Sequence, residues 1–215
     1  MSTSVADSLT CVPQTSKRWF AWELTCNFVL AAFFLQFVVI NGSDLLSAFR
    51  FSTLLLLIKV STDAALHLVR APAKQISHSV FDWGIGIAGS FTTFFYRSAE
   101  GQDFWLGTAI QLLGLSLAVA AMCSLNRSIG FVAANRGIKT SGLYRLVRHP
   151  MYFAYIVAFG GFVINQWTLN NAVVFAVMVY CFFLRTLCEE RVLSEDSDYR
   201  EYKRRVKYRL IPKLL

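Results

Sequence analysis

Residues 141–152 read Ser-Gly-Leu-Tyr-Arg-Leu-Val-Arg-His-Pro-Met-Tyr, a polar segment between two long apolar runs. Gly142 favours a turn because glycine adopts positive φ readily. Pro150 suits the first position of a helix, where a backbone N–H would have no partner in any case. The free N–H groups of Met151, Tyr152 and Phe153 would point back toward His149 and form an anion or carboxylate site. The segment therefore predicts a turn, a cationic stretch and a helix start at one polar site.

The composition of the chain is that of a membrane protein. Of 215 residues, 55% are hydrophobic and only 16% are charged, with 19 Phe, and the mean hydropathy is +0.48. An ordinary soluble domain is less apolar. The net charge of +8 lies in short segments beside apolar runs. This placement favours an anionic lipid surface as the partner, and we expect no binding of nucleic acid.

Apolar runs of helix length divide the chain. They cover residues 19–40, 49–69, 81–96, 104–125, 151–164 and 171–187. A membrane-crossing helix needs about 20 apolar residues, so the third and fifth runs are short. We predict an all-α, multi-pass bundle of five to six transmembrane helices. Its organisation would be a flexible N-terminus (1–18), N-terminal transmembrane helices (19–125) and a functional core (126–215).

The distribution of basic residues predicts the orientation. Most of the 21 Lys and Arg residues lie at the N-terminus, in residues 70–74, in residues 126–149 and from Arg185 onward. The positive-inside rule then makes both termini and the 126–149 segment cytoplasmic. We expect an integral protein of the cell inner membrane rather than the endoplasmic reticulum, since no retrieval signal is visible.

Two further patterns lie in the N-terminal half. Lys59, Asp63 and His67 share one helical face by their i, i+4, i+8 spacing. They indicate either a structural Lys–Asp pair or a substrate or proton pathway, and the pair is the simpler reading. Gly84-x-Gly86-x-x-Gly89 has the spacing of a dinucleotide-binding loop but no strand before it, so we interpret it as helix packing.

The C-terminal motifs resemble a known enzyme family. Gly142-x-Tyr144-x-x-x-Arg148-His149-Pro150-x-Tyr152 is followed by Arg185-x-x-x-Glu189-Glu190 and by Tyr199-x-x-Tyr202. Together they are similar to the isoprenylcysteine carboxyl methyltransferases, to which phospholipid N-methyltransferases are related. The resemblance covers residues 125–212 and implies an integral-membrane methyltransferase that uses S-adenosyl-L-methionine. The cofactor site would lie on the cytoplasmic side, between the last loop, a helical hairpin and the C-terminal segment.

The resemblance also implies roles for individual residues. Arg185 and Glu189 would be catalytic, and Arg185 would hold the acceptor substrate. The cofactor would contact Arg136, Gly137, Ile138, Lys139, Tyr144, His149, Pro150, Met151, Tyr152 and Glu189. Glu190 points about 100° away from Glu189 on a helix, so the two carboxylates should not share one role.

Other interpretations remain open on the sequence alone. Arg185 and Glu189 could form a simple intrahelical ion pair. The chain could be a membrane NADPH-dependent reductase of the sterol or steroid type, or a non-catalytic lipid-binding membrane protein. The acceptor could be a prenylcysteine carboxylate, a phospholipid amine, a lipid phosphate or a small thiol. It would reach the site from the bilayer between helices near Gly160 and Gly161. The five cysteines contain no Cys-x-x-Cys pair, and we expect no metal.

Overall fold

The computed structural model describes residues 17–47, 49–69, 71, 73–77, 79–97, 103–125, 128, 130 and 132–211. Of the predicted N-terminal segment 1–18, only Lys17 and Arg18 are therefore included. Pro212, which cannot continue a helix and would end the C-terminal one, lies outside the described residues. The helices are α1 (Lys17–Ser47), α2 (Phe51–Val69), α3 (Val80–Phe91), α4 (Trp105–Leu125), α5 (Pro150–Asn165), α6 (Leu169–Leu193) and α7 (Ser197–Arg205). Short 3-10 turns η2 (Thr92–Phe95) and η3 (Gly142–Arg145) and the strands β1 (Gln75–Ile76) and β2 (Ala134–Asn135) complete the fold.

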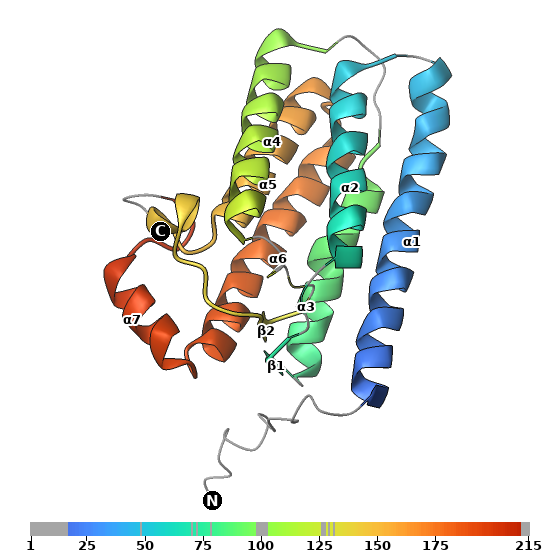
Figure 1. Ribbon diagram of the computed structural model, residues 1–215. Helices are drawn as coiled ribbons and strands as arrows, with labels where there is room; N and C mark the ends of the chain where they lie inside the picture. Colours follow the sequence, from blue (N-terminus) through green and yellow to red (C-terminus); the bar gives the residue numbers. More distant parts are fainter. Residues whose placement is uncertain are drawn as a thin grey trace, which may run out of the picture.

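The helices α1 to α6 form a bundle that the chain traverses back and forth (Figure 1). One end, called here the polar end, holds the segments 73–77, 132–149 and 194–211. At the opposite end, the Arg50 guanidinium donates to Gln166 (3.0 Å) and the Ser52 hydroxyl donates to Asp103 (2.6 Å). The segments that the basic residues predicted to share one side of a membrane therefore lie at one end of the bundle.

The prediction of an all-α fold with five to six spans is confirmed only in part. The described residues are mostly helical, and two helices, α4 and α6, are long and apolar enough to cross a membrane. Residues 27–39 of α1 and all of α5 are shorter apolar stretches. With 12 residues, α3 rises only about 18 Å, less than the ~30 Å of a bilayer core. The structure also adds an antiparallel ribbon, in which Gln75 pairs with Asn135 and Ile76 with Ala134.

Close packing of α4 against α5 depends on glycine. A Cβ at Gly114 would lie 2.2 Å from the backbone nitrogen of Ala158, and one at Gly161 would lie 2.5 Å from that of Gln111. Such approach of two backbones is available only to small residues. Gly161 is therefore buried in a helix interface. A Cβ at Gly160 would lie at an ordinary contact distance from the ring of Phe175 (3.6 Å). The expectation that the acceptor passes between helices near Gly160 and Gly161 stays a prediction.

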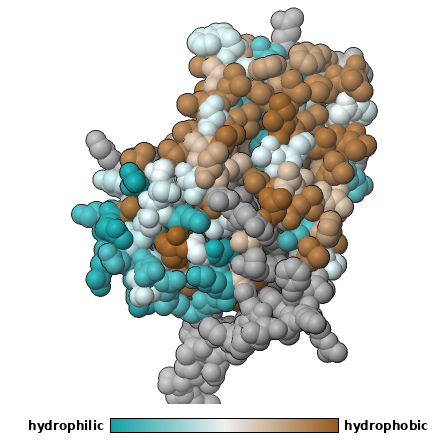
Figure 2. Space-filling view, in the orientation of Figure 1, coloured by the Kyte–Doolittle hydropathy of each residue, from teal (hydrophilic) through white to brown (hydrophobic). Residues whose placement is uncertain are grey.

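The surface divides by polarity along the bundle. Hydrophobic residues predominate over the upper part of the bundle, while hydrophilic residues gather where α7 lies (Figure 2). The exposed large apolar residues come from several helices: Phe28, Val39, Phe51, Leu68, Phe81, Leu113, Val119, Val173 and Tyr180. A soluble monomer rarely exposes apolar surface on this scale. The distribution fits a bundle in lipid with one end in water.

Candidate active site at the polar end of the bundle

The 141–152 segment folds as its residues predicted. Gly142 has φ +58°, and a Cβ there would lie 2.0 Å from the Ser124 hydroxyl oxygen. The turn η3 follows, and α5 begins at Pro150. The Phe153 N–H is bonded to the His149 carbonyl (3.4 Å) inside the first turn, so it is not available to a ligand. The glycine and the proline thus fix where the cationic segment lies relative to α5.

Glu189 is the centre of the site. It accepts a hydrogen bond from the Tyr152 hydroxyl. Its other carboxylate oxygen lies 3.5 Å from Nδ1 of His149, and Nε of Arg185 lies 3.5 Å from Oε1. The guanidinium of Arg185 also lies 5.5 Å from the centre of the Tyr152 ring. Residues from α5, α6 and the segment before α5 therefore meet at one carboxylate.

His149 lies between the two glutamates. Its Nε2 is 3.5 Å from Oε1 of Glu190, without hydrogen-bond geometry. Burial by itself would lower the pKa of His149, but the carboxylates of Glu189 and Glu190 raise it above its ordinary value overall. The imidazole is therefore held toward its protonated form at neutral pH.

Glu190 has a different function, which the sequence did not reveal. It accepts from Nε of Arg148 (2.7 Å), and it pairs with Lys203 (2.9 Å) and Arg209 (3.0 Å). The Arg148 guanidinium also donates to the carbonyls of Val206 (2.9 Å) and Lys207 (2.7 Å). Glu190 is only 3% exposed, and this network ties the C-terminal segment to α6. Five of the seven residues 203–209 are Lys or Arg, but nothing in the sequence assigned them to Glu190.

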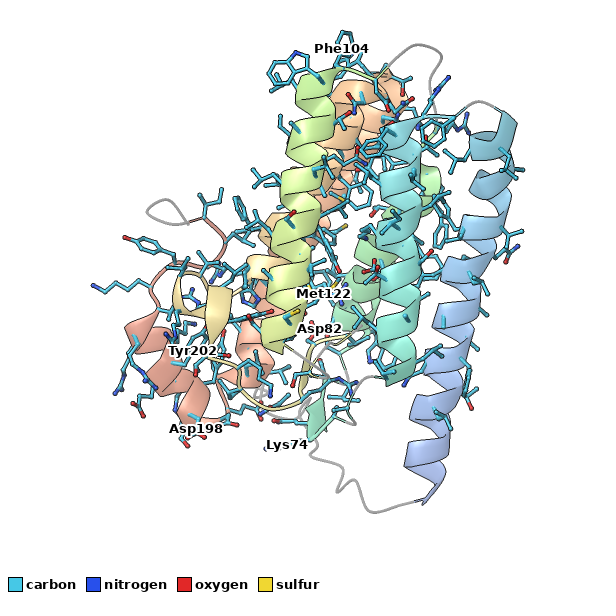
Figure 3. All side chains as sticks on the ribbon, turned by 45° about the horizontal axis from the view of Figure 1, so that its top comes forward. Lys74, Asp82, Phe104, Met122, Asp198 and Tyr202 are labelled. Atoms are coloured by element: carbon cyan, nitrogen blue, oxygen red, sulfur yellow. The ribbon has the colours of Figure 1, made fainter. Side chains whose placement is uncertain are left out.

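The C-terminal segment closes over the site from the other side. The Arg148 N–H donates to the Tyr208 carbonyl and the His149 N–H donates to the Arg209 carbonyl, both at 2.9 Å. The Tyr202 hydroxyl donates to the Tyr144 carbonyl (2.7 Å). Figure 3 shows Tyr202 and Asp198 of α7 at the end of the bundle opposite Phe104. The helix α7 and the residues after it therefore cover one side of the site.

A cavity of about 100 Å³, called here the first cavity, lies against α7. Nine of the ten residues that the resemblance assigned to the cofactor line it, and Pro150 does not. The additional lining residues are Leu125, Ser128, Gly130, Val132, Ala134, Arg148, Leu193, Tyr199 and Tyr202. Tyr199 and Tyr202 belonged to the motif, but we had assigned them no contact. Arg185 lies outside this cavity and lines a second one beside it.

The ribbon of β1 and β2 holds the loop of residues 136–139, all four of which line the first cavity. Gly137 has φ +98°, and its N–H donates to the Asn135 side chain (2.9 Å). The Arg136 guanidinium donates to the Ala71 carbonyl, and the Asn135 amide donates to Asp196 (3.0 Å). Ile138 and Lys139 follow, both half-buried. Strand pairing therefore positions the predicted cofactor loop against the last helices.

The cavity contains polar atoms without partners. Among the described residues, the Tyr199 hydroxyl and Nε2 of His149 are buried and make no hydrogen bond. Buried polar groups are normally paired, so two such atoms in one cavity lining favour a polar ligand. S-adenosylmethionine offers hydroxyl, amino, carboxylate and adenine groups, and the mixed lining of acid, cation and tyrosine fits this set.

Comparison with known proteins agrees with this geometry. The sequence model of the phospholipid methyltransferase family matches residues 102–198. Methanethiol S-methyltransferase 1 of Bradyrhizobium diazoefficiens is 37% identical over 89 residues, which are 40% of this chain and 30% of that protein. Protein-S-isoprenylcysteine O-methyltransferase A of Arabidopsis thaliana is 30% identical over 112 residues, 47% of this chain and 57% of that protein. The chain thus covers well under two thirds of either relative. The methyltransferase resemblance indicated by the motif is confirmed, and the matched segment holds all but two of the residues that line the cavity.

Proposed function

We propose that this chain is an integral-membrane methyltransferase that transfers a methyl group from S-adenosylmethionine to a lipophilic or membrane-embedded acceptor. The observation that carries the proposal is the cavity at the polar end of an apolar bundle, where Glu189, His149 and Tyr152 meet. A prenylcysteine-like carboxylate or a lipid head group would be the acceptor. In the membrane, α4 and α6 cross the bilayer together with the other long helices, as five to six spans.

Each group of lining residues suits one part of the cofactor. The carboxylate of Glu189 suits the ammonium or the ribose hydroxyls. The N–H groups of Met151 and Tyr152 at the start of α5 suit the carboxylate. The rings of Tyr144, Tyr199 and Tyr202 offer apolar faces for the adenine. When bound, the cofactor would supply a sulfonium methyl group.

The protein's contribution would be alignment and exclusion of water rather than acid–base chemistry. The helix α7 and the residues after it cover the cavity, and the ion pairs of Glu190 hold this C-terminal segment against α6. Holding reactants in line is worth several kcal/mol, on the order of 7–11 in the best cases. By the positive-inside rule, both termini and the cavity would face the cytoplasm of a cell with an inner membrane.

Titration calorimetry on the purified full-length chain tests the proposal. We expect S-adenosylhomocysteine to bind and NADPH not to bind. Binding of NADPH alone would establish the reductase alternative. Binding of neither nucleotide, by a protein that is folded as judged by its thermal transition, would leave the non-catalytic lipid-binding alternative.

A further inference from the structure

Asn135 lies between two sides of the first cavity without lining it. It is the second residue of β2 and is only 4% exposed. The loop of residues 136–139 follows it directly, and all four residues of this loop line the cavity. On another side, α7 contributes Tyr199 and Tyr202 to the same lining. Any effect of Asn135 on a ligand would therefore act through its neighbours.

Both ends of the Asn135 side-chain amide are engaged. Its oxygen accepts a hydrogen bond from the Gly137 N–H (2.9 Å), and its nitrogen donates to Oδ2 of Asp196 (3.0 Å). Gly137 has φ +98°, a conformation that glycine adopts more readily than other residues, so the loop bends sharply at the residue that Asn135 holds. Because the amide is rigid and planar, it fixes the separation between this loop and Asp196.

Asp196 connects Asn135 to α7. It is the N-cap residue of that helix, and its Oδ1 accepts from the Asp198 N–H (2.9 Å). The two carboxylate oxygens thus have separate partners, the helix on one and Asn135 on the other. The hydrogen bond from Asn135 is the main cause that holds the pKa of Asp196 below its ordinary value, so this side chain is a carboxylate at neutral pH. An acceptor at 196 requires a donor at 135.

An apolar contact also joins the loop to α7. Ile138 packs against a buried cluster formed by Tyr144, Tyr199, Tyr202 and Val206. Burial of apolar surface is non-directional, so this contact holds the loop near α7 without setting the angle between them. Hydrogen bonds require near-linear geometry. The two bonds of the Asn135 amide therefore set how the loop and the start of α7 are oriented.

The backbone of Asn135 is anchored independently of its side chain. It pairs with Gln75 across the ribbon, and its carbonyl accepts from the Lys74 N–H (2.7 Å). Asn135 is thus a fixed point, from which one side chain reaches both the loop and the helix.

We propose that Asn135 is a positioning residue of the cofactor site, which couples the 136–139 loop to α7 so that two sides of the first cavity are ordered together. A ligand that orders the loop then also orders the start of α7, through Asn135 and Asp196. The inference rests on the proposed function for the identity of that ligand, S-adenosylmethionine. The coupling itself is a property of the unliganded chain.

Reversing the donor and the acceptor tests the coupling. Asn135→Asp keeps the acceptor for the Gly137 N–H but places a carboxylate against that of Asp196. Titration calorimetry of the full-length protein in detergent should then show S-adenosylhomocysteine binding weakened about tenfold or more. Adding Asp196→Asn to this variant restores a donor opposite an acceptor, and asparagine caps a helix about as well as aspartate. The doubly substituted protein should return to within about threefold of the wild-type affinity.

Gln75→Glu is the matched control. Gln75 is the partner of Asn135 in the ribbon, and its amide donates to Glu195 in the same turn between α6 and α7. The change adds the same charge to the same kind of amide–carboxylate pair, but this pair is exposed and Glu195 does not line the first cavity. The affinity should stay within about twofold of the wild type, because exposed pairs contribute little. A loss as large as that of Asn135→Asp would overturn the proposal.

Because a buried unpaired charge can unfold a protein, Asp196→Ser gives an independent variant at a half-exposed position. Serine still caps α7, but its single oxygen leaves the Asn135 amide without its acceptor. We expect an intact thermal transition and S-adenosylhomocysteine binding that is weakened severalfold. Wild-type affinity in this variant would overturn the proposal, since α7 would then be positioned without Asn135.

Hydrogen exchange measures the coupling without any ligand. In the unliganded protein, Asn135→Asp should speed amide exchange in residues 136–139 and in α7 together, and the added Asp196→Asn should slow both again. Faster exchange in only one of the two segments would contradict the coupling.

The two measurements separate failure of the inference from failure of the proposed function. If the wild type and Asn135→Asp bind S-adenosylhomocysteine equally well, Asn135 is not a positioning residue and the proposed function stands. If the exchange rates change as expected but the wild type does not bind S-adenosylhomocysteine, the proposed function fails, and the role of Asn135 in positioning that cofactor fails with it.

Discussion

Glu189 and Glu190 are adjacent in the chain but contact different groups. Glu189 lines the first cavity and contacts Tyr152, His149 and Arg185. Glu190 lies outside that cavity and holds Arg148 and the C-terminal segment. Substitutions of the two carboxylates are therefore expected to impair different properties, ligand binding for Glu189 and stability for Glu190.

Glu189→Gln should weaken S-adenosylhomocysteine binding roughly tenfold to a hundredfold, since a charge-assisted contact is worth ~1.5–3 kcal/mol. Glu190→Gln should chiefly lower the thermal unfolding midpoint, because it leaves three cations around a neutral amide. Glu201→Gln, on the exposed face of α7, is the control and should change neither quantity. Equal cofactor affinity in Glu189→Gln and Glu201→Gln would remove Glu189 from the cofactor site.

His149 predicts a pH dependence of stability. Its folded-state pKa is raised above the ordinary value of 6.5 by the flanking carboxylates. The protonated imidazole therefore stabilises the fold fully below about pH 6.5, and this contribution is lost as the pH rises through the raised pKa. The unfolding midpoint in detergent should fall from pH 6.5 upward in the wild type and fall less in His149→Gln. Parallel curves for the two proteins would contradict the prediction.

At the scale of the elements, the closest contact is that between α4 and α5. Gly114→Ala would drive a methyl group into the backbone of Ala158, so it should destabilise the protein by about 1–3 kcal/mol. Gly84→Ala is the matched control on α3, where a Cβ meets nothing within 4 Å. There the change should be neutral or slightly stabilising, because alanine favours a helix more than glycine does. Thermal unfolding of both variants in detergent measures the difference. Similar midpoints would mean that α4 and α5 pack less closely than described.

At the scale of the whole molecule, the two ends of the bundle should face opposite sides of a membrane. Lys139 lines the first cavity at the polar end, and Trp167, which is 69% exposed, lies in the turn between α5 and α6. In a background without native cysteines, Trp167→Cys should react with an impermeant maleimide added to intact cells. Lys139→Cys should react only after the membrane is opened. Reaction of both positions in intact cells would rule out the predicted orientation.

The sequence by itself determined the features that depend on local chemistry. The apolar runs predicted two helices nearly to the residue, 104–125 against Trp105–Leu125 and 49–69 against Phe51–Val69. The longer helices α1 and α6 extend beyond the predicted ends at 40 and 187, to Ser47 and Leu193. Gly142 and Pro150 fixed the turn and the start of α5, because φ preference and a missing N–H act within one residue. The family resemblance also implied nine of the residues that line the first cavity.

Only the tertiary structure decided which distant residues meet. The ribbon joins residues 75–76 to 134–135, and two-residue strands leave no periodic pattern in a sequence. The partners of Glu190 come from two segments far apart in the chain, Arg148 before α5 and Lys203 and Arg209 in the C-terminal segment. The Lys59–Asp63 pair was expected from its spacing, but its place beside Arg185 in a second cavity was not. The side chain of His67, which the spacing puts on the same face of α2 as Lys59 and Asp63, lies outside the described part of the structure. The physical reason is the same in each case, since the periodicity of a helix shows that a face is buried, whereas helix packing decides what that face meets.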